Sequence, residues 1–250
     1  MTEFLRVDTV SKHFGGLRAV EEVSFDLAEG TLTAIIGPNG AGKTTLFNLI
    51  AGALPTTRGE VRFLGRRVRN QRGAYRLGLA RTFQNVRLFP QLSVLENVLV
   101  GMGDAGFLKA SLRLPQAVTA DRLRMKRAYY LLEEAGLAEQ AEAPARDLPF
   151  GRQRLLEIAR ALAINPKLLL LDEPAAGLNR TETAALAAHL RRLHGTGITL
   201  LLVEHDMHLV MNLVQRAIVL NQGRLIADGA PAEVRADPAV CAAYLGAAPC

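Results

Sequence analysis

One stretch near the start of the chain restricts its possible folds more than any other feature. It fits the pattern G-x-x-x-x-G-K-[ST] of phosphate-binding loops and reads Gly37-Pro38-Asn39-Gly40-Ala41-Gly42-Lys43-Thr44-Thr45. The apolar run 32–36 before it predicts a short buried strand, and residues 45–51 after it predict the first turns of a helix. The motif requires this strand–loop–helix context, so we expect a nucleotide to bind here.

The chemistry expected of this loop follows from its residue types. Glycines let backbone N–H groups curl around a β-phosphate where side chains would obstruct the approach. The helix that follows directs its partially positive N-terminus at the same anion. Lys43 can reach the β- and γ-phosphates, and Thr44 can offer its hydroxyl to Mg²⁺. The alternative for such a pattern is a Gly-rich turn that precedes a helix and binds nothing.

A second candidate site follows a run of four leucines. Residues 168–171 predict a buried strand, and Asp172 and Glu173 come directly after it. In α/β sheets, ligands bind beyond the carboxyl ends of the strands. We expect Asp172 to hold Mg²⁺ through water and Glu173 to polarise the water that attacks the γ-phosphate. Strands often end in charged residues, so this pattern gains its weight from the phosphate loop earlier in the chain.

The rest of the chain alternates strands and helices around an all-helical middle. Strands predicted at 4–10, 19–27 and 59–65 flank the phosphate loop and indicate an antiparallel sheet beside the nucleotide-binding core. A further strand is predicted at 78–83, and later strands alternate with helices, which implies a parallel sheet covered on both faces. We therefore predict an α/β P-loop NTPase with a RecA-like parallel-sheet core, an antiparallel β subdomain and an inserted helical subdomain.

One predicted helix in the middle of the chain is basic and amphipathic. It is stopped by Gly136, and its apolar face carries Met125, Ala128, Tyr129, Leu132 and Ala135. We interpret this face as core or as a contact between subunits. Binding to a membrane surface is the alternative.

The net charge leaves several classes of partner open. A formal charge of +6 and a pI near 9.7 suit an anionic ligand, a nucleic acid, an acidic membrane or a plain solvated surface. Aromatic residues are few and Trp is absent, which argues against a stacking platform for nucleic acid. No run approaches the ~20 apolar residues of a transmembrane helix. Residues 1–5 lack a basic segment followed by an apolar one, so we expect no signal peptide and a cytosolic location.

Five motifs occur in the order found in the ATP-binding subunits of ABC transporters, and the chain resembles that family over nearly its whole length. They are Lys43 with its loop, Gln84, Leu148–Arg160, Asp172-Glu173-Pro174 and Glu204-His205-Asp206. The resemblance implies one ABC ATPase domain over residues 1–250 that binds ATP and Mg²⁺ between two subunits. Its expected parts are a nucleotide-binding core with the β subdomain at 1–89 and 151–236, a helical subdomain at 90–150 and a tail at 237–250.

The resemblance also implies roles for single residues. Gln84 would sense Mg²⁺ and the attacking water, and it would link the site to a transmembrane partner. His205 would contact the γ-phosphate, with a satisfied core imidazole as the alternative. Phe14 stands where an aromatic ring stacks on adenine, although a core position is equally compatible with its sequence context. Gly151 and its neighbours would serve the nucleotide bound by the opposite subunit.

The signature segment, residues 148–152, departs from the family pattern. The common form is Leu-Ser-Gly-Gly-Gln, whereas this chain has Leu148-Pro149-Phe150-Gly151-Arg152. Pro149 lacks both the usual hydroxyl and an N–H group, and Phe150 adopts positive φ less freely than glycine. Gly151 and the following helix keep an N-terminus that can face an anion, and Arg152 adds charge. We expect a half-site that is weakened but not abolished.

Further stretches resemble the ATP-binding subunits of branched-chain (hydrophobic) amino-acid importers. They are Gln84–Pro90, Asp172–Asn179, Glu204–Met207 and the tail Ala243–Gly246. In those systems two different ATP-binding subunits pair beneath two transmembrane permease subunits, which a periplasmic or extracellular substrate-binding protein supplies. The resemblance thus implies a peripheral protein on the cytoplasmic face of the inner membrane. Its expected partner is a paralogous ATP-binding subunit, or a second copy when the chain is isolated.

Two other functions share part of these motifs. The first is an ATPase for lipopolysaccharide extraction, whose cassettes contain several of the same segments. The second is a soluble ABC ATPase that acts on DNA or ribosomes, which the basic pI favours. Such proteins usually carry two cassettes in one chain or a long coiled-coil insertion. This chain has neither, so we expect no nucleic-acid partner.

Overall fold

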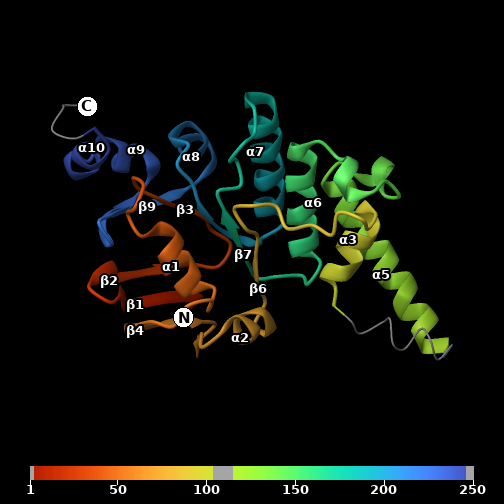
Figure 1. Ribbon diagram of the computed structural model, residues 1–250, viewed down its shortest axis with the longest axis horizontal. Coiled ribbons are helices and arrows are strands. Elements are labelled where there is room, and N and C mark those ends of the chain that lie inside the picture. The colour runs from red at the N-terminus through yellow and green to blue at the C-terminus, as the bar shows by residue number, and fades with distance from the viewer. Residues whose placement is uncertain (1–2, 104–114, 246–250) are drawn as a thin grey trace.

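The computed structural model describes residues 3–103 and 115–245. Figure 1 shows two neighbouring sheets and a group of helices at one end of the molecule. The strands are β1 Leu5–Phe14, β2 Leu17–Leu27, β3 Leu32–Ile36, β4 Arg58–Phe63, β5 Arg66–Arg67, β6 Leu79–Arg81, β7 Leu168–Asp172, β8 Thr199–Val203, β9 Arg216–Asn221 and β10 Arg224–Gly229. The helices are α1 Lys43–Ile50, α2 Gln71–Arg76, α3 Val94–Gly101, α5 Pro115–Glu134, α6 Phe150–Leu162, α7 Arg180–Gly195, α8 Met207–Leu213, α9 Pro231–Ala236 and α10 Pro238–Leu245.

The larger sheet has the strand order β10-β9-β3-β8-β7-β6. Its strands are parallel except for β10, which pairs with β9 as an antiparallel hairpin. Every residue of β3, β7 and β8 is buried, as expected for parallel strands covered on both faces. In register, Val203 lies opposite both Ile35 and Asp172, so β3, β7 and β8 end at the same edge of the sheet.

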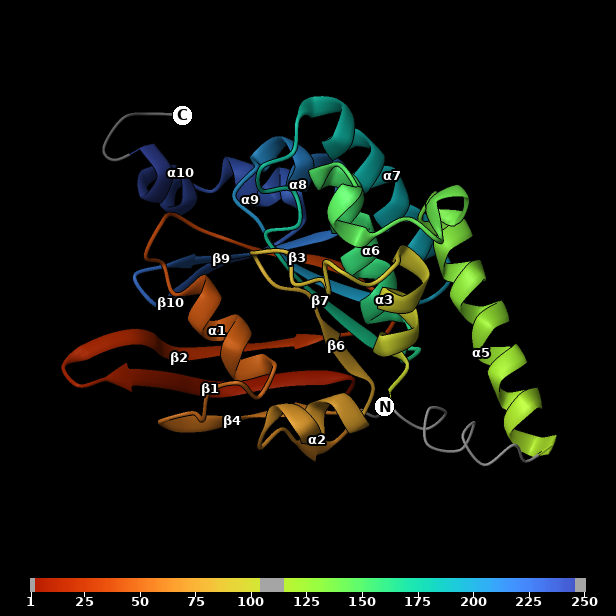
Figure 2. The ribbon, with the colours of Figure 1, turned by 45° about the vertical axis from the view of Figure 1, so that its right-hand side comes forward.

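Alternate residues of these strands pack into two separate cores, because successive side chains of a strand point to opposite faces. Ile35 and Leu170 pack with α1 and the antiparallel strands. Leu169 and Leu171 pack with α6, α7 and α8 and with the group of helices. Figure 2 shows α1 lying between the two sheets.

The smaller sheet is antiparallel with the order β2-β1-β4-β5, which confirms the predicted antiparallel sheet beside the core. The group of helices is formed by α3 and α5, and α6 packs against both. A capping box between Ser93 and Glu96 begins α3, as its sequence predicts. At the other end of α3, a Cβ on Gly101 would lie 2.4 Å from the carbonyl oxygen of Arg160, so α3 and α6 approach closely there.

The amphipathic face of α5 is only partly as predicted. Ala128, Leu132 and Ala135 are buried in the core, which confirms the core interpretation for them. Met125 and Tyr129 are 39% and 36% exposed, so they do not belong to the core, and a contact between subunits stays a prediction for these two positions.

Several boundaries differ from the sequence-based expectations. Helix α1 begins at Lys43 rather than Thr45, and β6 spans only part of the strand predicted at 78–83. Helices α2, α9 and α10 were not predicted. Within the expected tail, Pro238–Leu245 form α10, and residues 246–250 lie outside the described residues. Among the described residues no helix combines the length and apolarity needed to cross a bilayer.

Candidate functional site

The phosphate-binding loop joins β3 to α1. At two of its positions the neighbouring backbone leaves room only for glycine. Gly37 has φ 153°, and a Cβ there would lie 2.2 Å from the carbonyl oxygen of Leu220. Gly42 has φ 98°, and its Cβ would lie 2.3 Å from the carbonyl oxygen of Ala19. The loop is thus held between β9 and β2, with its backbone conformation fixed by glycine.

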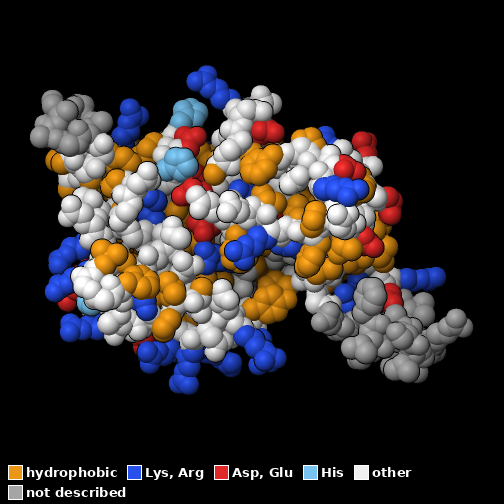
Figure 3. Space-filling model, in the orientation of Figure 1, with side chains coloured by type: hydrophobic (Ala, Val, Ile, Leu, Met, Phe, Trp, Pro, Cys, Tyr) orange, Lys and Arg blue, Asp and Glu red, His pale blue; other side chains and the backbone are white. Residues whose placement is uncertain are grey.

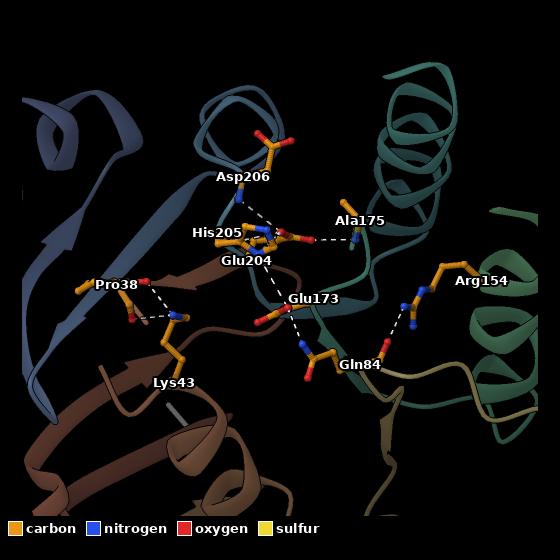
Figure 4. A network of polar contacts seen from close by, with 10 residues as sticks. Pro38, Lys43, Gln84, Arg154, Glu173, Ala175, Glu204, His205 and Asp206 are labelled. Carbon is orange, nitrogen blue, oxygen red and sulfur yellow. Dashed lines mark hydrogen bonds and ion pairs between the residues drawn. The ribbon is translucent and has the colours of Figure 1, made fainter. Parts of the chain in front are cut away.

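Lys43 closes this loop from inside. Its buried ammonium donates hydrogen bonds to the carbonyl oxygens of Gly37 at 2.6 Å and Pro38 at 2.9 Å (Figure 4). Burial lowers the pKa of Lys43, and the nearby carboxylate of Glu173 partly opposes this shift. A buried cation gains most from an anionic partner, so this position suits the phosphates of a nucleotide.

Glu173 follows the end of β7 and faces two polar side chains from other loops (Figure 4). The side-chain amide of Gln84 donates to Glu173 Oε2 at 2.9 Å, and His205 Nδ1 lies 3.8 Å from the same oxygen. Glu173 has φ 45°, a left-handed conformation that is uncommon outside glycine and is often found at functional sites. The three predicted catalytic residues therefore converge on one carboxylate oxygen.

Asp172 is nearly buried and is held by an arginine that the sequence did not indicate. Arg81 Nη2 donates to Asp172 Oδ2 at 2.7 Å, and the two side chains are 10% and 6% exposed. Arg81 Nη1 donates to Oδ1 of Asn48 on α1 at 2.6 Å. Arg81 thus connects the strand that carries Asp172 to the helix that follows the phosphate loop.

Glu204 joins the loops that follow β7 and β8. It is fully buried, and its carboxylate accepts from the backbone N–H of Ala175 at 2.9 Å and of His205 at 3.1 Å. Burial raises the pKa of Glu204, and these hydrogen bonds act in the opposite direction. The sequence showed Glu204 only as part of a motif, without this bridging position.

Arg154 of α6 holds the loop that contains Gln84. It is fully buried and donates to the carbonyl oxygens of Phe83 and Gln84, both at 2.7 Å (Figure 4). It also pairs with Glu157 at 2.9 Å, and burial raises the pKa of that carboxylate. In the sequence Arg154 is one of three arginines in α6 and carries no sign of this role.

Two predicted nucleotide contacts lie outside this cluster, Phe14 at the end of β1 and Gly151 in the first turn of α6. Phe14 ends β1 and is 46% exposed, with the ammonium of Lys12 lying 5.1 Å from its ring centroid. This exposure is incompatible with a core position, and stacking on adenine stays a prediction. Gly151 is buried in the first turn of α6, where a Cβ would lie 2.6 Å from Oε1 of Glu182.

The oxygen donors at this edge suit a magnesium ion. Asp172 supplies a carboxylate, Thr44 an exposed hydroxyl in the first turn of α1, and Gln84 a side-chain carbonyl. Hard divalent cations prefer such oxygen ligands, and Mg²⁺ keeps several waters in addition. The residues present therefore fit Mg²⁺ bound together with nucleotide phosphates.

Two family models match the chain. The ABC transporter family matches residues 20–176, which include the phosphate loop, Gln84, Gly151, Asp172 and Glu173. A second family, described as branched-chain amino acid ATP-binding cassette transporter, matches residues 224–249. The matched regions therefore cover most of the candidate site and the C-terminal end, whereas Phe14, Glu204 and His205 lie outside them.

Similar proteins and structures agree with these matches. The chain is 44% identical to the high-affinity branched-chain amino acid transport ATP-binding protein BraF of Pseudomonas aeruginosa, over 98% of both chains. The ADP conformation of an ATP-binding cassette of an ABC transporter superposes with a TM-score of 0.86 at 32% identity, over 98% of this chain and 100% of that one. A dimeric cassette in a post-hydrolysis state with ADP and phosphate gives a TM-score of 0.75 at 27% identity, over 91% and 99%.

Proposed function

The chain belongs to the ABC transporter family of ATP-binding proteins, and from this premise we propose that it drives the uptake of branched-chain or other hydrophobic amino acids. As a member of that family it is an ATP-hydrolysing subunit of a membrane-associated transporter. The C-terminal family match and the name of the Pseudomonas relative support amino acids as the cargo. They favour this function over lipopolysaccharide extraction and over action on nucleic acids.

Binding of ATP is the task of the phosphate loop and α1. The N–H groups of the loop and of the first turn of α1 surround the β-phosphate, and Lys43 exchanges its carbonyl partners for phosphate oxygens. Phe14 stacks on the adenine. The observation that carries the proposal is the joint position of Lys43, Glu173 and Gln84 at the edge where β3 and β7 end.

Hydrolysis requires a base that accepts a proton from water, and Glu173 is that base. Gln84 and His205 approach the same carboxylate oxygen, so they orient the water and the γ-phosphate relative to the base. Glu204 fixes the backbone on both sides of this arrangement. Asp172, Thr44 and Gln84 hold Mg²⁺, which neutralises phosphate charge when it is bound.

A second ATP-binding subunit completes the site. Gly151 and the start of α6 face the nucleotide of that subunit, and the partner is a paralogue or, for the isolated chain, a second copy. The similar cassette that is dimeric with ADP and phosphate supports this arrangement. The assembly lies on the cytoplasmic face of the inner membrane and receives its cargo from an external substrate-binding protein.

A groove beside the edge strand β6 is the docking site for a cytoplasmic segment of the permease. It has a volume of about 270 Å³ and lies where α2, β6, α3 and α6 meet; its lining includes Gln71, Tyr75, Arg81, Phe83, Gly101 and Arg160. Tyr75 and nearby Phe89 are 48% and 46% exposed, although both are large aromatic residues. Figure 3 shows hydrophobic side chains at the surface in the region where α2 meets α3.

Reconstitution tests the proposed function directly. The chain is combined with its cognate permeases and its partner subunit in liposomes, with the substrate-binding protein and radiolabelled leucine on the opposite side of the membrane. We expect leucine uptake that depends on ATP and is lost with Lys43→Ala. A complex that neither retains nor hydrolyses ATP would contradict the proposed function. ATP hydrolysis that is insensitive to every amino acid would contradict amino acids as the cargo.

A further inference from the structure

Arg81 occupies the boundary between the groove and the catalytic edge. It is the last residue of β6, the strand at the edge of the larger sheet, and it pairs in register with Leu170 of β7. Beyond β6 the sheet ends and the groove begins. A side chain at this position can therefore reach both sites.

On the inner side, Arg81 contacts two elements of the nucleotide site. One terminal nitrogen donates to Asp172 at 2.7 Å and the other donates to Asn48 of α1 at 2.6 Å. Both members of the ion pair are about nine-tenths buried, with 10% and 6% of their side chains exposed. A nearly buried carboxylate depends strongly on its partner, because its charge has little access to water.

On the outer side, Arg81 is part of the wall of the groove, together with Phe83. The guanidinium lies 5.2 Å from the ring centroid of Phe83 and 5.3 Å from that of Phe47, so aromatic rings hold it in place. Its Nε is buried and has no hydrogen-bond partner among the described residues.

We propose that Arg81 couples the permease groove to the magnesium carboxylate. A permease segment that seats in the groove presses on Phe83, and the guanidinium packed against that ring passes the displacement to Asp172. This route reaches the metal-binding carboxylate through a single side chain and does not pass through Gln84. Arg81 is a positioning residue, since it contacts Asp172 rather than the nucleotide.

This inference rests on the proposed function, because it takes the permease as the occupant of the groove. The planar guanidinium is essential to it, since only a fork of donors reaches Asp172 and Asn48 at the same time. Lysine keeps the charge but offers one point of contact. Arg81→Lys should therefore lose part of the effect and Arg81→Met most of it.

The first test measures the Mg²⁺ dependence of nucleotide binding by the full chain, with a fluorescent ATP analogue and no turnover. Arg81→Met should raise the Mg²⁺ concentration at half-saturation about tenfold, while binding in EDTA changes less than twofold. Arg81→Lys should lie between Arg81→Met and the unchanged chain. Arg76→Met is the matched control, because Arg76 is an exposed arginine of neighbouring α2, and it should leave the midpoint unchanged.

The second test compares ATP hydrolysis of the chain alone and in the complex with the permeases. Tyr75→Ala, on the groove wall away from Asp172, should reduce stimulation by the permeases and leave the Mg²⁺ midpoint unchanged. Arg81→Met should alter both quantities. If Arg81→Met weakens binding equally with and without Mg²⁺, or if it leaves stimulation intact, the coupling role is excluded. Normal ATP binding in EDTA by the same variants keeps the proposed function separate from this outcome.

Discussion

The phosphate-binding loop and the start of α6 each lead into a helix N-terminus that can face an anion, yet they are built in different ways. The loop is enclosed by backbone: carbonyl groups of Leu220 and Ala19 leave no space for side chains at its glycines. The start of α6 has Pro149 as its N-cap without a side-chain hydrogen bond, and Gly151 in its first turn lies against the side chain of Glu182 rather than against backbone. One region has a fixed shape, and the other has a shape that side chains set.

This difference indicates that the chain's own nucleotide site is held more rigidly than the segment that we propose to serve a partner's nucleotide. Of the residues that we propose to act on its own nucleotide, Lys43 and Glu173 have two polar partners each and Asp172 has a nearly buried ion pair with Arg81. The segment that we propose to serve the partner's nucleotide retains a helix N-terminus but lacks the usual serine. Two composite sites in a heterodimer would therefore be unequal in activity.

Substitution of Glu173 by Gln should have the largest effect. Loss of the base should lower ATP turnover of the assembled complex by about a thousandfold or more, while ATP binding is retained, since general base catalysis is worth about 10²–10⁴-fold. Phosphate release and equilibrium nucleotide binding measure the two quantities. Glu139→Gln, on a turn outside the site, serves as control. Turnover near the normal rate in the Glu173 variant would exclude it as the base.

Alanine substitutions at Gly42 and at Gly151 should lower the free energy of unfolding by different amounts. Gly42→Ala meets a backbone carbonyl at positive φ and should cost about 3 kcal/mol of unfolding free energy, with loss of ATP binding. Gly151→Ala meets only the side chain of Glu182 and should cost about 1 kcal/mol. Urea denaturation gives these values. Equal costs for the two single variants would contradict the comparison.

Acidic pH should lower the stability of the region where α6 and α7 pack together, because it favours protonation of His189. This residue of α7 is 2% exposed beside a cavity it shares with Leu155 of α6, and burial, aided by the charge of Arg192, lowers its pKa from 6.5 to about 4. A lowered pKa favours the neutral imidazole, so its contribution is complete above pH 6.5 and declines as the pH falls toward 4. Preferential protonation of this histidine in the unfolded chain lowers the free energy of unfolding by roughly 2–3 kcal/mol.

Denaturation at pH 7.5 and at about pH 5 checks this linkage. His189→Gln should flatten the pH dependence between these values, although it lowers stability at neutral pH. His208→Gln, on the surface of α8, should leave the pH dependence as it is. Identical slopes for the His189 variant and the unchanged chain would show that the imidazole is not responsible.

Restoration of the common signature serine should give the smallest effect. Pro149→Ser returns a hydroxyl and an N–H group to the start of α6, and one added hydrogen bond is worth about 1 kcal/mol. We expect ATP turnover of the complex to rise about two- to fivefold, measured with the same partner subunit. A fall in turnover at normal stability would mean that this segment does not face the partner's nucleotide.

Much of the fold could be predicted because its information is local. The phosphate loop and the leucine strand that ends in Asp172 are continuous segments with strong patterns, and the structure has both elements where the patterns placed them. Helix α2 escaped prediction because its residues are mostly polar and its start depends on a single cap, Asn70. Met125 and Tyr129 fit the helical period of a buried face but are exposed, because periodicity does not show which part of a helix its neighbours cover.

The parts of the site that the sequence concealed depend on distant pairs. Arg81 and Asp172 are 91 residues apart, and Arg154 and Gln84 are 70 residues apart. Neither arginine belongs to a pattern that periodicity or spacing can reveal, because its partner is chosen by the arrangement of strands and helices. Long-range ion pairs and contacts to backbone carbonyls therefore require the folded structure.

The buried side chain of Arg154 has a mechanical consequence. It ties two carbonyl groups of the Gln84 loop to the same helix whose first turn carries Gly151. A displacement of the Gln84 loop should therefore also shift the start of α6. If that helix faces the nucleotide of a second subunit, as we propose, the states of the two nucleotides are coupled through this one arginine.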